Sequence, residues 1–302
     1  MKRILTKIRK RSDVLRGVLP TALIRKAKTA EEQVVEIVRL LTDVKYKSDY
    51  TNIYHCALQK TGTQWMYDIL SDPLVYKYSG LSIKRFNIPR RKSQAHKISG
   101  IDEPYKKNTI ISGVSGTYSN YRKGIPKKDT KHRAFFVIRD PREMVVSWYF
   151  STKSNHIVEP VSMMAVHRKK LNKKSKEDGL KYVIELFEWK GKFEVMRSWM
   201  KNKNKKNVKI VKFENLADGD LSCYRSLFDF MDVQIPEKKL KKLVEDYSFE
   251  SLTGRRNKKE KTDSHMRSGT KKTWNKHLSQ EHISILKNKA SDITKGFGYT
   301  SD

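Results

Sequence analysis

Cysteine is almost absent from this chain of 302 residues, which has only Cys56 and Cys223. Two cysteines cannot build a disulfide framework, and none of the Cys/His spacings typical of zinc sites occurs. Cys56 falls in an apolar segment and Cys223 in a helix expected over 221–231, so we expect both to be buried thiols. This cysteine usage fits a reducing compartment, and we predict a cytoplasmic protein.

Long apolar runs are also missing, and no stretch reaches the roughly 20 residues of a membrane-spanning helix. The N-terminus is basic, and its charges interrupt every short apolar run, so we expect no signal peptide. We predict a basic, helical N-terminal extension over residues 1–48. Its apolar residues form one loose helical face, a pattern that also permits peripheral contact with an anionic membrane. We favour packing on the domain, or a disordered arm, over that contact.

Acidic residues are scarce, because 33 Asp and Glu stand against 65 Lys and Arg, which gives a formal net charge of +32. Such a field attracts anionic ligands and polyanions. Three explanations stay open: an acidic glycan or lipid headgroup as partner, contact with nucleic acid, and compositional drift in a chain rich in Lys and Asn. We favour drift with loose polyanion affinity, and we expect no specific nucleic-acid partner.

Strand-like and helix-like segments alternate along the chain, and this alternation predicts an α/β fold with a parallel sheet. The predicted strands cover residues 52–58, 109–112, 133–138 and 208–213. The predicted helices cover residues 31–41, 180–200, 220–231, 236–247 and 279–295. The basic stretch over 71–107 contains several prolines, and we expect it to be irregular. We also expect Trp189 and Trp199 to belong to the core.

The most informative segment is Lys60–Trp65, which joins the strand-like run over 52–58 to a helix-like run. A turn between a strand and a helix can bind phosphate, because the N–H groups at the helix start lack partners. Thr61 and Thr63 add hydroxyl donors, and Lys60 adds a positive charge. A Walker A loop is excluded, because no earlier glycine precedes the lysine. Alone, the segment fits an ordinary loop equally well.

A second segment suits another phosphate. The apolar run over 134–138 predicts a central strand, and Arg139 follows at its carboxyl end. Asp140 and Pro141 are typical of a helix start, and Ser147 lies two turns further on a face that can look back at Arg139. A guanidinium beside a hydroxyl suits an isolated phosphate. The alternative is an Arg–Asp pair at a strand end, with Ser147 merely lining a helix.

Together these segments resemble the sulfotransferases that use 3'-phosphoadenosine-5'-phosphosulfate (PAPS). The family's phosphosulfate pattern K-[ST]-G-T-x-W matches Lys60–Trp65, and its 3'-phosphate pattern R-[DN]-P-x-[DE]-x-x-x-S matches Arg139–Ser147. Residues 210–216, 247–249 and 265–274 are similar to three later family segments, in the same order. The resemblance implies a P-loop-like, three-layer α/β fold, with a central parallel sheet flanked by helices, in a single domain over 49–302.

The resemblance also implies a reaction and a set of residues. The reaction is transfer of a sulfuryl group from PAPS, as co-substrate, to a hydroxyl or amine of an unidentified acceptor, without a metal. A glycan, a glycolipid and a small metabolite are the acceptors considered. Lys60 is the implied catalytic cation. The implied donor-binding residues are Lys60, Thr61, Gly62, Thr63, Gln64, Trp65, Arg139, Ser147, Phe213, Phe249, Arg267, Ser268 and Gly269.

The general base is not identified by the sequence, because the strand that corresponds to the family's K-T-H reads Ile110–Val114. We rank His156 and His96 first as catalytic bases, ahead of Asp102 and Glu103. His55 lies inside a strand, and we expect it to be a hydrogen-bonded core residue. The alternative function is a catalytically degenerate nucleotide- or polyanion-binding protein of the same fold. A P-loop kinase-like activity is disfavoured, because the Walker A pattern is missing.

Overall fold

A five-stranded parallel sheet lies at the centre of the protein, with strand order β2-β3-β1-β4-β5. The computed structural model describes residues 21–86, 105–123, 125, 131–155, 162–255 and 273–299. The strands are β1 (Asn52–Ala57), β2 (Ser82–Arg85), β3 (Thr109–Val114), β4 (His132–Ile138) and β5 (Val208–Lys212). The predicted α/β class and parallel sheet are confirmed.

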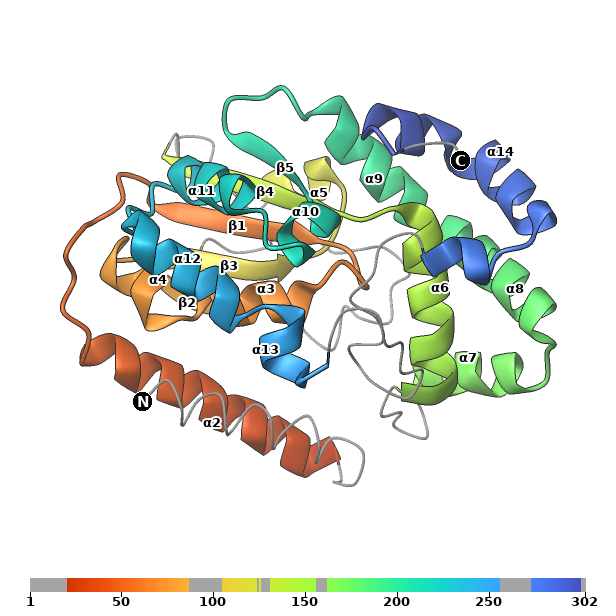
Figure 1. Cartoon of the computed structure of the whole chain (residues 1–302), viewed down its shortest axis with the longest axis horizontal. Coiled ribbons are helices and arrows are strands. Elements are labelled where there is room, and N and C mark those ends of the chain that lie inside the picture. Colours follow the sequence, from red (N-terminus) through yellow and green to blue (C-terminus); the bar gives the residue numbers. More distant parts are fainter. Residues whose placement is uncertain are drawn as a thin grey trace.

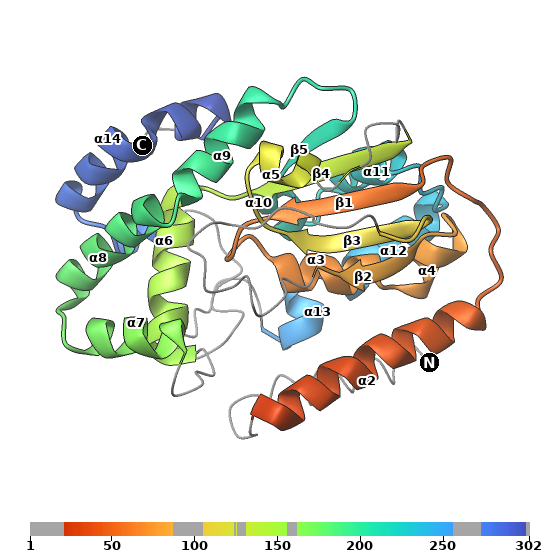
Figure 2. The same cartoon turned by 180° about the vertical axis from the view of Figure 1, so that it is seen from behind.

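Helices cover both faces of this sheet (Figures 1 and 2). The helices are α2 (Thr21–Leu40), α3 (Thr63–Leu70), α4 (Pro73–Lys77), α5 (Tyr118–Lys123), α6 (Pro141–Phe150), α7 (Met163–Asn172), α8 (Lys176–Trp189), α9 (Lys192–Lys201), α10 (Phe213–Ala217), α11 (Leu221–Phe230), α12 (Glu237–Asp246), α13 (Phe249–Thr253) and α14 (Gln280–Gly296). A π-helical turn, η2 (Ser151–Asn155), follows α6, and a 3-10 helix, η3 (Thr273–Lys276), precedes α14. The result is a three-layer arrangement.

The two central strands divide the core into two apolar clusters, because successive side chains of a strand point to opposite faces. Phe136 of β4 packs in the cluster with α6, α8, α9 and α14, whereas its neighbour Phe135 packs in the cluster with α3, α11 and α12. Every residue of β1 is buried. Burial on both faces explains why apolar residues occupy both faces of these strands, and in β1 it also encloses the polar residues Asn52 and His55.

Two sequence-based expectations about the helices and loops are wrong. The single helix predicted over 180–200 is two helices, because Gly191 adopts a left-handed conformation with φ of 64° between α8 and α9. Consequently Trp199 is fully buried, whereas Trp189 is 61% exposed. The irregular stretch predicted from residue 71 contains α4, capped by the Asp72 side chain, and then β2, which pairs with β3 at the sheet edge.

Helix α2 lies along the edge of the domain near β2 and α4 (Figure 1). It begins ten residues before the predicted start at 31, and Val38 is its buried anchor. The proposed boundary at residue 48 stays a prediction, and residues 1–20 lie outside the described ranges. Of the two cysteines, Cys56 is buried as expected, and Cys223 is half-buried. Within the described part of the chain, no helix is long and apolar enough to cross a membrane.

Candidate functional site

The candidate site lies at the edge of the sheet where the parallel strands end. The carboxyl ends of β1, β4 and β5 meet there, because all three strands run in the same direction. β1 leads through a turn over 58–62 into α3, β4 leads through Arg139 into α6, and β5 leads directly into α10 at Phe213. The two segments singled out from the sequence therefore lie at one edge, as strand ends in open α/β sheets do.

The turn before α3 has a backbone that few residues can adopt. Gly62 caps α3 in the left-handed region with φ of 76°, and it supplies no side-chain cap. A Cβ atom at Gly62 would lie 2.6 Å from the Phe213 ring, so only glycine fits. Lys60 also has φ of 76°, which is uncommon for a residue with a side chain. The first N–H groups of α3 thus face the site without a competing cap.

The two threonine hydroxyls of the turn make hydrogen bonds within the turn. The Thr61 side chain is buried and donates its hydroxyl hydrogen bond to the Leu58 carbonyl at 2.8 Å. Thr63 donates to the same carbonyl at 3.3 Å. These bonds stabilise the turn, and the role of both hydroxyls in phosphate binding stays a prediction. Backbone N–H groups and Lys60 remain as the turn's groups for an anion.

Gln64 is held by side chains rather than left free for a ligand. Its amide nitrogen donates to Asp68 at 2.9 Å, and its amide oxygen accepts from Arg85 at 2.8 Å. Arg85 ends β2, and its guanidinium lies over the Tyr67 ring at 3.4 Å. The side chain of Gln64 therefore joins the start of α3 to β2. The group of Gln64 that suits an anion is its backbone N–H, in the first turn of α3.

Arg139 connects the two phosphate-type segments directly. Its Nη1 donates to the Lys60 carbonyl at 2.9 Å, although the two residues are 79 positions apart. Its Nη2 lies 3.4 Å from a Glu143 carboxylate oxygen, and its guanidinium lies 4.6 Å from the centre of the Phe213 ring. A guanidinium held by a carbonyl, a carboxylate and a ring is fixed beside the turn, which favours binding of an anion without reorganisation.

Glu143 anchors the segment that follows the late loop. It is buried, and it accepts hydrogen bonds from the Thr273 hydroxyl at 2.9 Å and from the Trp274 N–H at 3.1 Å. The same carboxylate contacts Arg139. The sequence pattern contains Glu143 but assigned it no role, whereas the structure places it between Arg139 and η3.

Glu214 is a second carboxylate that the sequence did not single out. It accepts from the Asp140 N–H and from the Tyr299 hydroxyl, both at 3.0 Å. Burial raises the pKa of Glu214 above its usual value, and these hydrogen bonds oppose that effect. Glu214 thus joins the start of α6 to α10 and to Tyr299, which follows α14. Only its place at the end of β5 could have signalled this role.

The predicted aromatic residues gather beside the turn. Trp65 and Phe213 meet edge to face with ring centres 5.9 Å apart, and the Trp65 indole N–H donates to the Tyr247 carbonyl at 2.8 Å. Tyr247 lies two residues before Phe249, which begins α13 and is half-buried under the Arg255 guanidinium. These rings provide apolar surface next to the cationic groups, as a nucleotide base requires.

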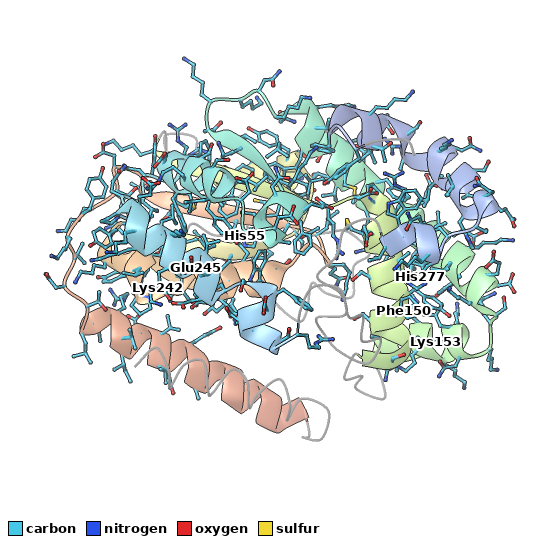
Figure 3. The ribbon with its side chains drawn as sticks, viewed as in Figure 1. His55, Phe150, Lys153, Lys242, Glu245 and His277 are labelled. Atoms are coloured by element: carbon cyan, nitrogen blue, oxygen red, sulfur yellow. The ribbon has the colours of Figure 1, made fainter. Side chains whose placement is uncertain are left out.

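His55 is a core residue, as expected from its place in a strand. Its side chain is fully buried in β1 (Figure 3), its Nδ1 lies 2.8 Å from the Ser112 hydroxyl, and its ring stacks on Phe135. Burial lowers the pKa of His55 to about 3, so the ring is neutral at physiological pH. A neutral, enclosed imidazole cannot exchange protons readily with a ligand.

Other predicted site residues either make no side-chain hydrogen bond or lie outside the described ranges. Ser147 is half-buried in α6, and its hydroxyl makes no hydrogen bond in the structure as described. The residues that lie outside the described ranges are the base candidates His156, His96, Asp102 and Glu103, and the late-loop residues Arg267, Ser268 and Gly269. Among the described histidines, His277 is partly exposed, and it packs against Phe150 at the end of α6 (Figure 3).

Among the described residues, no group of three or more His, Cys, Asp or Glu side chains could hold a metal ion. The charged groups at the strand ends are instead Lys60 and Arg139, with Glu143 and Glu214 behind them.

Comparison with known proteins gives a consistent picture. Residues 50–297 match the family model described as a sulfotransferase domain. Over 181 residues, which are 55% of this chain and 45% of the relative, the sequence is 26% identical to luciferin sulfotransferase from Photinus pyralis. The matched part thus spans less than half of that relative's length.

Two solved structures share the fold. Mouse sulfotransferase SULT7A1 complexed with PAP has a TM-score of 0.55 and 14% identity, covering 84% of this chain and 88% of that one. Retinol dehydratase in a complex with retinol and PAP has a TM-score of 0.50 and 13% identity, with 81% of each chain covered. At such identities the likeness concerns the arrangement of the sheet and its helices.

Proposed function

Because the chain belongs to the sulfotransferase family of enzymes, we propose that it transfers a sulfuryl group from PAPS to a hydroxyl or amine of an acceptor. The matched range of residues contains both phosphate-type segments and the residues that hold them together. Two solved structures of similar fold are complexes with PAP, the product that PAPS leaves after transfer. These relationships support the donor but leave the acceptor undefined.

The contact between Arg139 and the Lys60 carbonyl carries the proposal. It places a guanidinium, an ammonium-bearing residue and the start of α3 at one edge of the sheet. Such a set of donors suits a ligand with anionic groups at two ends, as PAPS has at its 3' and 5' positions. The rings of Trp65 and Phe213 lie beside these groups and can pack against the adenine.

In the proposed mechanism the protein acts by positioning and by electrostatic stabilisation. The acceptor oxygen or nitrogen forms a bond to sulfur while the bond between sulfur and the bridging oxygen breaks. The electron pair of that bond stays on the 5'-phosphate, where Lys60 and the N–H groups of α3 stabilise it. The acceptor proton passes to a base, for which His156 and His96 are the candidates.

Thermal unfolding in the presence of nucleotides tests this function. A ligand at about one hundred times its Kd adds about 2.7 kcal/mol to the free energy of unfolding. PAP should therefore raise the melting temperature, whereas ADP and ATP, which lack a 3'-phosphate, should raise it less. No shift, or an equal shift with ATP, would instead favour the degenerate nucleotide- or polyanion-binding protein. A steep salt dependence with heparin would support that alternative.

The acceptor, compartment and membrane contact are separate proposals. We propose an acceptor hydroxyl or amine on a glycan, a glycolipid or a small metabolite, with an acidic glycan or lipid headgroup suited to the charge of +32. We place the protein in the cytoplasm, with peripheral membrane contact through the basic N-terminus as the weaker proposal. A screen of neutral and acidic acceptors with PAPS, in matched concentrations, distinguishes the acceptor classes.

A further inference from the structure

Lys192 is the most deeply buried lysine of the described residues, with 7% of its surface exposed. It begins α9, directly after the left-handed Gly191. Its stem packs in the protein, and its Nζ lies 5.0 Å from the centre of the Phe187 ring. Nζ also donates a hydrogen bond to the side-chain oxygen of Gln59 at 3.3 Å. Gln59 is exposed and directly precedes Lys60, so the ammonium group of Lys192 contacts the turn over 58–62.

Among the residues that the structure describes, no carboxylate pairs with Lys192. The groups that face it are the neutral amide of Gln59 and the ring of Phe187, with the charges of Lys190 and Lys60 nearby. Burial, followed by the charges of Lys190 and Lys60, lowers the pKa of Lys192 to about 8. A buried ammonium without a counter-ion destabilises a fold. Its place at the start of a helix adds a further unfavourable interaction with the helix dipole.

These features fit a site that is completed by an anionic ligand. We propose that Lys192 is a donor-binding residue whose ammonium group binds the anionic 5' end of PAPS beside Lys60. This inference rests on the proposed function and extends its donor site to α9, which no pattern in the sequence indicated. In Figures 1 and 2, α8 and α9 pass the end of the sheet at which β1 leads into α3, so α9 starts on the side where the turn lies.

Donor binding then has a consequence for protons. An anionic group beside Lys192 favours its charged form and raises its pKa. Above pH 8 the side chain of Lys192 is partly neutral in the free protein and charged in the complex with the donor. Donor binding therefore takes up a proton. Donor affinity should therefore fall as the pH rises above 8, by up to about tenfold per pH unit for a single linked proton.

Calorimetric titration with three nucleotides tests the inference. Lys192→Met removes the charge and keeps an apolar stem, and Lys201→Met, at the exposed far end of the same helix, is the matched control. The probes are PAP, adenosine 3'-phosphate and adenosine 5'-phosphate. Lys192→Met should lower the affinity for PAP and for adenosine 5'-phosphate by about 10- to 100-fold, which is the effect of losing one charge-assisted hydrogen bond. Adenosine 3'-phosphate should bind both variants as it binds the wild type.

Proton uptake gives a readout that a purely packing role of Lys192 would not change. Titration of PAP at pH 8 in buffers of different ionisation enthalpy should show uptake by the wild type and by Lys201→Met, and none by Lys192→Met. The wild-type measurement stands even if Lys192→Met does not fold. Unchanged PAP affinity in Lys192→Met, equal loss for the 3'- and 5'-phosphates, or no proton uptake by the wild type would each overturn the inference and leave the proposed function intact. A wild type that does not bind PAP would overturn both.

Discussion

Arg142 and Lys192 are cations buried to a similar depth, with 6% and 7% of their surfaces exposed, but their surroundings differ completely. Arg142 makes an ion pair with Asp140 at 2.7 Å, and its guanidinium lies 4.1 Å from the centre of the Trp274 ring. Lys192 has an amide, a ring and two further lysines around it. Within the described part of the chain, the first charge has a carboxylate partner and the second has none.

This difference separates structural charge from binding charge. A buried ion pair with good geometry fixes neighbouring elements, and here it holds the start of α6 against η3. A buried charge without a partner lowers stability and gains a favourable interaction only when an anion arrives. In a chain with 65 basic residues, the partners of each cation therefore say more about function than the net charge does.

The largest expected effect lies on the structural side of the comparison. Arg142→Met leaves the buried Asp140 carboxylate without its partner, so the free energy of unfolding should fall by about 3–5 kcal/mol. Urea unfolding at fixed pH measures this change, and Lys192→Met, which removes an unbalanced charge, should be at least as stable as the wild type. If Lys192→Met lost as much stability as Arg142→Met, the distinction between the two cations would be wrong.

Lys60 gives the next effect, on the binding side. Lys60→Ala removes the charge proposed to stabilise the leaving phosphate, so the rate of PAPS consumption with an accepted substrate should fall by about 10²–10³-fold or more. The melting temperature should change little, because Lys60 is half-exposed and the turn is held by Thr61 and Gly62. Unchanged turnover in a folded Lys60→Ala protein contradicts the proposed mechanism.

Arg139 lies between the two classes, because it contacts the Glu143 carboxylate and also donates to the Lys60 carbonyl in the turn. Arg139→Ala should lower the affinity for PAP by about 10- to 100-fold, as expected for the loss of a charge-assisted hydrogen bond. The affinity for adenosine 5'-phosphate should fall much less, because the resemblance assigns Arg139 to the 3'-phosphate. Competition binding with both nucleotides measures this, and equal losses would reassign Arg139 to the turn that it contacts through the Lys60 carbonyl.

The sequence predicted those parts of the fold that depend on neighbours in the chain. β1 is buried throughout, β4 contains the apolar run over 134–138, and Asp140 and Pro141 begin α6 as their local chemistry requires. β2 was missed, because a short edge strand that is only partly buried is stabilised by pairing with β3 rather than by its own pattern. The break at Gly191 was missed, because glycine inside a helical pattern is often tolerated.

The sequence indicated which two segments end at the same edge of the sheet, but it did not indicate the contacts between their side chains. A lysine and a glycine between a strand and a helix carry a local signal, so the turn was found. The direction of the Thr61 hydroxyl depends on how the turn folds against Leu58, so it cannot be predicted from the residue type alone. Lys192 has no signature at all in a lysine-rich chain, because its burial results from the packing of α8, α9 and the turn after β1.

The smallest expected effect concerns a half-exposed ion pair, which completes the comparison. Arg85 lies 3.6 Å from Glu32 of α2, with side chains 17% and 44% exposed, and it keeps Gln64 and Tyr67 as partners without that carboxylate. Glu32→Gln should therefore change the free energy of unfolding by less than about 1 kcal/mol. Glu36→Gln is the control, because Glu36 pairs with Arg39 inside α2. A loss of several kcal/mol for Glu32→Gln alone would mean that α2 is integral to the domain, and the boundary proposed at residue 48 would then move toward the N-terminus.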